Sequence, residues 1–153
     1  MIGLIFAMAV GVPTYSPFGS PPPGYKLLAP EVRFAVPKAS WLHLGVQAPV
    51  LLGGNYLAST DTVMGLCAFA HLEAPIMDNG YLYVRGGPAV FGSPTVGLAA
   101  GPQVMTEIGI GAAPPKRRGG LGLRFGWLHY SNGSMSVQNE GLNYLSANIE
   151  VRL

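Results

Sequence analysis

The sequence predicts an all-β chain that forms an eight-stranded antiparallel up-and-down transmembrane β-barrel. Three observations lead to this fold class. Apolar and polar residues alternate along several segments, which is the period of a β-strand. Only 10% of the residues are charged, whereas 49% are hydrophobic. No run of apolar residues reaches the ~18 that a spanning helix needs, and a closed barrel is the other structure that satisfies its backbone hydrogen bonds in lipid.

The alternation is clearest in the C-terminal segment 119–153. One face of its two predicted strands is almost entirely apolar, and the other carries glycines and charges. The apolar set is Leu121, Leu123, Phe125, Trp127, Leu145, Ala147, Ile149, Val151 and Leu153. A soluble β-sandwich that buries this face is the alternative fold, but small and charged residues on the opposite face favour the narrow lumen of a barrel.

The first residues leave three alternatives open. The apolar stretch 2–12 has the length of a signal-peptide core, yet no lysine or arginine precedes Lys26. Residues 1–16 are therefore a signal peptide, an incomplete gene start or a first strand. The proline-rich stretch 17–24 cannot lie inside a sheet, so a single barrel domain is expected over 25–153.

Within that domain, turn residues separate eight predicted strands. The strands are expected at 25–36, 40–49, 62–73, 80–91, 95–101, 103–112, 119–131 and 142–153. Pro30, Pro49 and Pro102 lie within or beside these segments, and each is expected to mark a strand end or a bulge because proline lacks a backbone donor.

Composition excludes several classes of function. The net charge of +2 comes without a basic stripe, so nucleic acid is not an expected partner. The single Cys67 excludes an intramolecular disulfide and a thiolate cluster. His43 and His71 lack the carboxylate or cysteine neighbours expected of a metal site and are interpreted as core or lumen residues. The sequence therefore predicts neither a metal nor a cofactor.

His129 and Ser131 are the candidate catalytic pair. They lie two residues apart on a predicted strand, and therefore on one face, about 6 to 7 Å apart at the backbone. An ester hydrolase needs a nucleophilic hydroxyl, a base and donors for the oxyanion. The following loop, 132–141, is rich in Asn, Ser and Gly that can supply such donors. The alternative is an ordinary histidine and serine at a strand end.

The motif gives this pair a more specific interpretation. HYSNG at 129–133, followed by NEGLN at 139–143, resembles the C-terminal signature of PagL-type lipid A 3-O-deacylases, in which H-x-S-N precedes N-x-G. The resemblance implies an outer-membrane barrel that hydrolyses the 3-position ester of lipid A and releases a 3-hydroxy fatty acid. It implies Ser131 as nucleophile and His129 as base, with the loop residues Asn132, Gly133 and Asn139 around the oxyanion.

One position departs from that signature. Two residues after the loop glycine, the best-studied pattern of the family has a glutamate that orients the histidine, whereas this chain has Asn143. An amide oxygen can accept from the histidine Nδ1–H but stabilises imidazolium less than a carboxylate does. Glu140 is an alternative acid, although a solvated loop charge is its simpler interpretation.

The resemblance also implies the surroundings of the site. Lipid A or lipopolysaccharide would be the substrate and outer-membrane lipids the neighbours, and a homodimer is left open. Bacterial barrels place their longer loops outside, so Ser131 is expected at the outer rim and residues 116–118 at the periplasmic rim. The alternative function is a noncatalytic structural or lipid-binding barrel that retains the motif, and Asn143 is the feature that separates the two.

Overall fold

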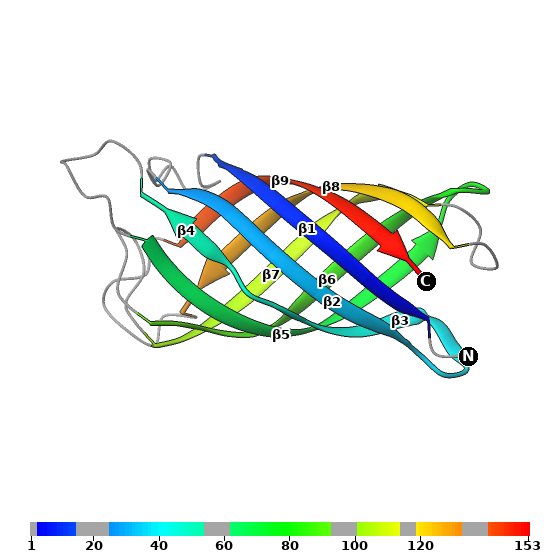
Figure 1. The fold of residues 1–153 in the computed structure, drawn as a ribbon, viewed down its shortest axis with the longest axis horizontal. Helices are drawn as coiled ribbons and strands as arrows, with labels where there is room; N and C mark the ends of the chain where they lie inside the picture. The colour runs from blue at the N-terminus through cyan, green and yellow to red at the C-terminus, as the bar shows by residue number, and fades with distance from the viewer. Residues whose placement is uncertain (1–2, 15–24, 54–61, 93–100, 114–118, 133–140) are drawn as a thin grey trace.

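The computed structural model describes residues 3–14, 25–53, 62–92, 101–113, 119–132 and 141–153, which form a barrel of antiparallel strands (Figure 1). The strands are β1 (Leu4–Pro13), β2 (Lys26–Val36), β3 (Ala39–Gln47), β4 (Val50–Leu52), β5 (Thr62–Pro75), β6 (Gly80–Phe91), β7 (Gly101–Ala112), β8 (Gly120–Ser131) and β9 (Leu142–Arg152). Within these described ranges, no helix is long and apolar enough to cross a membrane.

The strands occupy eight positions around the barrel. Consecutive strands pair from β5 to β9, and β1 pairs with both β2 and β9, which closes the sheet. β3 and β4 share one position, because each lies between β2 and β5. The predicted eight-stranded antiparallel barrel is confirmed, and the soluble sandwich is not the fold.

The predicted strands differ from the structure at three places: β4 (Val50–Leu52) lies outside the predicted segments, and the other two differences concern the N-terminus and Pro102. Leu4–Pro13, for which a strand was one of three alternatives, is β1 and completes the barrel. The separate strands predicted at 95–101 and 103–112 were wrong in their division, because Gly101–Ala112 is one continuous strand; residues 95–100 lie outside the described part of the chain. A strand end or a bulge was expected at Pro102, but Pro102 is the second residue of β7, and proline is compatible with the start of a strand.

Pro30, Pro49 and Pro102 all lack a backbone N–H donor, but they occupy different positions in the sheet. Pro49 lies in the gap between β3 and β4, and Pro102 is the second residue of β7, as expected of residues that lack a donor. Pro30 lies inside β2, where a strand end or bulge was predicted. The interruption is on the neighbouring strand instead. Glu31 of β2 pairs with Gln47 of β3, and Leu28 of β2 pairs with Val50 of β4, so Pro30 lies opposite the gap between β3 and β4.

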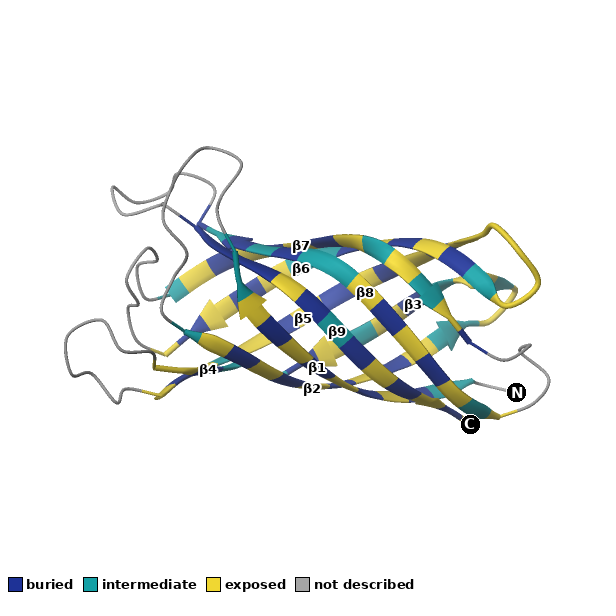
Figure 2. Ribbon diagram, turned by 90° about the horizontal axis from the view of Figure 1, so that it is seen from above, coloured by how far each residue is buried: buried dark blue, intermediate teal, exposed yellow. Residues whose placement is uncertain are grey.

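The side chains alternate between an apolar exterior and a polar lumen. Figure 2 shows buried and exposed residues alternating along the strands. Leu121, Leu123 and Phe125 on β8 are exposed, as are Leu145 and Ile149 on β9. This is the alternation expected when lipid covers the outside of a barrel.

The lumen is filled by paired charges. Among the described residues, the buried charged side chains are four arginines and four glutamates: Arg33, Arg85, Arg124, Arg152, Glu31, Glu73, Glu107 and Glu150. Arg85 contacts both Glu31 and Glu107, and Arg124 lies 2.6 Å from Glu31. Because opposite charges are equal in number and paired, this interior avoids the high cost of isolated buried ions.

Close packing in the lumen explains two glycines. Gly109 and Gly126 are directly opposite each other on β7 and β8. A Cβ on Gly109 would lie 2.8 Å from the Tyr83 ring, and one on Gly126 would meet the Tyr83 hydroxyl. The tyrosine ring therefore occupies the space that larger residues on these strands would need, as expected in a narrow barrel.

The two ends of the barrel differ in their connections. At one end, residues 37–38, 76–79 and 113–119 connect neighbouring strands, and both termini lie there (Figure 1). At the other end, the connections run over 14–25, 53–61, 92–100 and 132–141 and are longer. We call these the turn end and the loop end. By the usual topology of bacterial barrels, the loop end is extracellular.

Candidate active site

The candidate site lies where β8 ends and β9 begins, at the loop end of the barrel. His129 and Asn143 are directly opposite each other in the β8–β9 pair. His129 and Ser131 are half-buried, whereas Leu128 and Tyr130 between and beside them are fully buried. The alternation therefore places the pair on the outer face, away from the lumen, as the sequence predicted.

A hydrogen bond fixes the histidine ring. Nδ1 of His129 lies 2.9 Å from Oδ1 of Asn143. Because an amide oxygen only accepts, this bond requires the proton on Nδ1 and leaves Nε2 with a free lone pair. This is the tautomer that a general base needs.

Asn143 is buried even though it lies on the outer face. It has the parity of Leu145, which is 60% exposed, yet Asn143 itself is only 2% exposed. A hydrogen bond in such a water-poor position is held more rigidly than one on an open surface, where water competes for the same groups. The asparagine is thus suited to orient His129.

Two further residues contact the His129 ring. The indole of Trp127 stacks on the imidazole, with 5.5 Å between ring centroids and 9° between planes. Gly141 lies at the ring edge with a positive φ of 73°, and a Cβ there would be 2.7 Å from Cε1 of His129. Backbone conformation and space both require glycine at this position.

From the sequence, Trp127 was expected in the apolar outer row as an interface anchor or an ordinary packing residue; alternation does not reveal that its ring stacks on His129. Gly141 was present in the motif without an assigned role. Its positive φ and its contact with His129 give a physical reason for a glycine there.

The remaining predicted site residues are only partly described. Ser131 is the last residue of β8 and lies opposite Val104 of β7. Asn132 follows it and is buried. Gly133, Asn139 and Glu140 lie outside the described residues, as do the cationic residues 116–118. The structure therefore brings His129 and Asn143 together and leaves the loop donors as predictions.

The lumen contains a second group of polar side chains, formed by His43, His71 and Glu73. His43 and His71 were expected to lack a carboxylate neighbour, and that expectation was wrong, because Glu73 lies beside both. The signal was available: His71 and Glu73 are two apart on one strand and therefore share a face. The position of His43 opposite His71 depends on strand register, which the sequence did not give.

The comparisons with known proteins support the fold. No protein-family profile matches the chain, and no curated protein matches it. Among solved structures, the outer membrane enzyme PagL is similar, with a TM-score of 0.65 and 14% identity over 97% of this chain and 99% of that one. Neisserial surface protein A (NspA) is also similar, with a TM-score of 0.62 and 13% identity over 99% of this chain and 96% of that one.

The structural similarity establishes a common fold, but at sequence identities this low it does not establish a common activity. The fold and the apolar exterior are those of an outer-membrane barrel, in agreement with the predicted location in the bacterial outer membrane. One neighbour is described as an enzyme and the other as a surface protein, so the activity must be argued from the residues of the site.

Proposed function

We propose that this chain is an outer-membrane esterase that removes the acyl chain ester-linked at the 3-position of lipid A. The observation that carries the proposal is the His129–Asn143 hydrogen bond of 2.9 Å, beside a serine on the same outer face. This bond supports His129 as the base, because it holds the proton on Nδ1 and leaves Nε2 able to accept one, at the loop end of the barrel. The similarity to PagL is consistent with this activity but does not carry it.

The residues support a two-step acyl transfer. Nε2 of His129 takes the proton of the Ser131 hydroxyl as Oγ attacks the ester carbonyl, and donors in the loop stabilise the oxyanion. The bond between the acyl carbonyl carbon and the sugar oxygen breaks, and the His129 imidazolium protonates that leaving oxygen. Water, deprotonated by His129, then attacks the acyl-enzyme carbonyl; the bond between the acyl carbon and Oγ of Ser131 breaks, the imidazolium returns the proton to Oγ, and a 3-hydroxy fatty acid is released.

In this proposal Asn143 orients His129, and Asn132, Gly133 and Asn139 contribute to the oxyanion site. Glu140 is the alternative partner of His129. The site faces outward into the membrane boundary, so the substrate is a lipid of the outer leaflet, and lipopolysaccharide reaches the site by lateral diffusion. A homodimer remains a separate proposal that the activity does not require.

The direct test is mass spectrometry of lipid A from cells that express the chain. The expected result is a species that has lost one 3-hydroxyacyl group, with no such loss in cells that express Ser131→Ala. The variant must reach the membrane folded, which is checked by its altered electrophoretic migration on heating. Unmodified lipid A with both folded proteins would contradict the proposal.

A noncatalytic barrel is the second candidate function, and Asn143 is the observation that favours it. Without a carboxylate, the imidazolium that forms during proton transfer is stabilised less. A folded wild type that leaves lipid A intact, and that stays inactive when a carboxylate is introduced at this position, would favour a structural or lipid-binding role.

A further inference from the structure

We propose that His43, His71 and Glu73 bind a divalent transition-metal ion, best matched by Zn²⁺, inside the lumen near the turn end. This site lies on the inner face of β3 and β5, whereas the candidate esterase site lies on the outer face of β8 and β9. The proposal is independent of lipid A deacylation.

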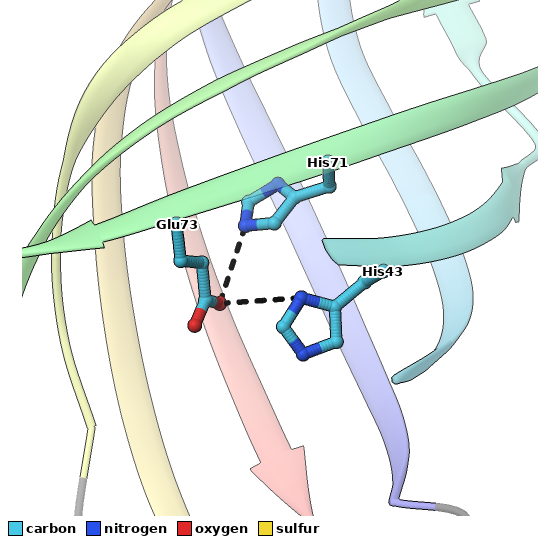
Figure 3. A group of neighbouring side chains, drawn as sticks. All are labelled: His43, His71 and Glu73. Atoms are coloured by element: carbon cyan, nitrogen blue, oxygen red, sulfur yellow. Dashed lines mark hydrogen bonds and ion pairs between the residues drawn. The ribbon is translucent and has the colours of Figure 1, made fainter. Parts of the chain in front are cut away.

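The strand register brings the three ligands together. His43 and His71 are directly opposite each other in the β3–β5 pair, and Glu73 follows two residues after His71 on the same face. Figure 3 shows both imidazole rings next to the Glu73 carboxylate. All three side chains are buried, so they lose their hydration when the barrel folds and not when an ion binds.

The distances are close to those of a metal site. Oε1 of Glu73 lies 3.3 Å from Nε2 of His71 and 3.8 Å from Nδ1 of His43. The three ligand atoms all lie within 4.8 Å of one another. Ligand atoms of one tetrahedral zinc ion are roughly 3.4 Å apart, given bonds of about 2.1 Å. Movements of less than about 1 Å would complete the coordination.

The donor types suit a divalent transition metal. Two imidazole nitrogens and one carboxylate oxygen form a common three-residue zinc set that leaves a fourth position for water. Glu73 also lines an open cavity of about 470 Å³ at the turn end, together with Ser40, Trp41, Tyr81 and Arg152. The cavity connects solvent with the Glu73 side of the proposed site, since Glu73 is the one of the three ligands that lines it.

Two arginines modify the site in opposite ways. Nη2 of Arg152 donates at 2.9 Å to Oε1 of Glu73, the same oxygen that faces both histidines, so it orients the carboxylate and leaves the second lone pair of Oε1 for the ion. Nη1 of Arg33 lies 2.8 Å from Nε2 of His71, the nitrogen that would bind the ion. The ion must displace this contact, while Arg33 keeps its ion pair with Glu150. Arg33 therefore competes with the ion for Nε2 of His71.

The test uses the full barrel, folded in detergent and stripped with a chelator. Titration with ZnCl₂ should give one ion per chain by calorimetry, and CoCl₂ should give the intense visible bands of four-coordinate Co²⁺. His43→Gln and His71→Gln should each weaken binding by more than the ~10- to 100-fold that loss of an outer-shell partner costs. His129→Gln is the matched control, because it removes a histidine at the other end, and it should bind as the wild type does.

Arg33→Lys provides a test in the opposite direction. Lysine keeps the positive charge near Glu150 but lacks the Nη1 group, so Zn²⁺ should bind about tenfold more tightly, the equivalent of one lost competing hydrogen bond. A wild type without saturable Zn²⁺ binding would overturn the proposal, as would equal binding by wild type and His71→Gln. If the histidine variants do not fold, a wild-type Co²⁺ spectrum typical of six oxygen ligands would overturn it.

Discussion

Replacing Asn143 with aspartate tests whether this residue orients the catalytic base. Aspartate has the same length as asparagine, so a carboxylate oxygen can take the place of Oδ1, 2.9 Å from Nδ1 of His129. The difference arises when His129 accepts the serine proton and becomes a cation. A hydrogen bond between neutral groups contributes about 1 kcal/mol, and one to a charged group about 1.5 to 3 kcal/mol.

The expected gain in kcat/KM is about tenfold, because a difference of about 1.4 kcal/mol in the barrier changes the rate by that factor. The gain is far below the ~10⁴-fold effect of the corresponding change in serine proteases. At 2% exposure, the carboxylate of Asn143→Asp has lost most of its hydration, which offsets part of the benefit. Asn143→Glu should gain less, because its extra methylene has to fit at this buried position.

The assay is deacylation of purified lipid A by the folded barrel in detergent, followed by mass spectrometry. Asn148→Asp is the matched control: it makes the same chemical change on the same strand at a site that is also 2% exposed. Asn148 accepts from Arg124 in the lumen at 3.3 Å, so its change should leave the rate unaltered. Equal rates for wild type and Asn143→Asp, with both folded, would refute the assignment of Asn143 as the orienting residue.

Four further outcomes follow from the same geometry. Ser131→Ala and His129→Ala should each abolish deacylation, and the double variant should be no worse than either single one because the pair acts as a unit; additive losses would separate them. Trp127→Leu should lower kcat about two- to fivefold, the loss of a cation–π contact of ~0.5 to 1 kcal/mol with the imidazolium, and an unchanged kcat would leave the stack without a catalytic role. Gly141→Ala should reduce activity more than tenfold while heat-modified migration persists, since its Cβ enters the His129 ring; wild-type activity would contradict the contact. Arg85→Ala should lower the free energy of unfolding in detergent by about 3 to 5 kcal/mol, because it removes the ion pair of the buried Glu107 and one of the ion pairs of the buried Glu31, and a urea titration showing no change would contradict the ion-pair network.

Much of the fold could be predicted because the alternation of residues reflects the two environments of the wall. Leu121, Leu123 and Phe125 are exposed as the pattern required, and Arg124 between them is buried in the lumen. The eight positions around the barrel were also predicted correctly, although the predicted set omitted β1 and divided β7. The division at Pro102 was wrong because a proline can occupy the start of a strand, and β1 was ambiguous because an apolar strand and a signal-peptide core have similar composition.

The candidate site shows a similar limit. Sequence parity placed His129 in the apolar row of one strand and Asn143 in the apolar row of the next, and both rows lie on the outer face of the barrel. Whether the two side chains meet depends on the register between β8 and β9, which places them directly opposite each other. The stack of Trp127 on His129 depends on side-chain rotamers, and these are set by packing that no local pattern encodes.

The pairing of β1 with β9 has a consequence for how the barrel forms. Ile5 lies opposite Arg152, so the contacts that close the sheet join residues almost a full chain apart. Contacts of such high sequence separation slow folding, because the entropy of closing the chain is lost before the new strand pair forms. Until β9 arrives, β1 has an unpaired edge of backbone donors and acceptors, and such edges recruit other chains. A chain lacking β9 should therefore self-associate through the open edges of β1 and β8 instead of closing into a seven-stranded barrel.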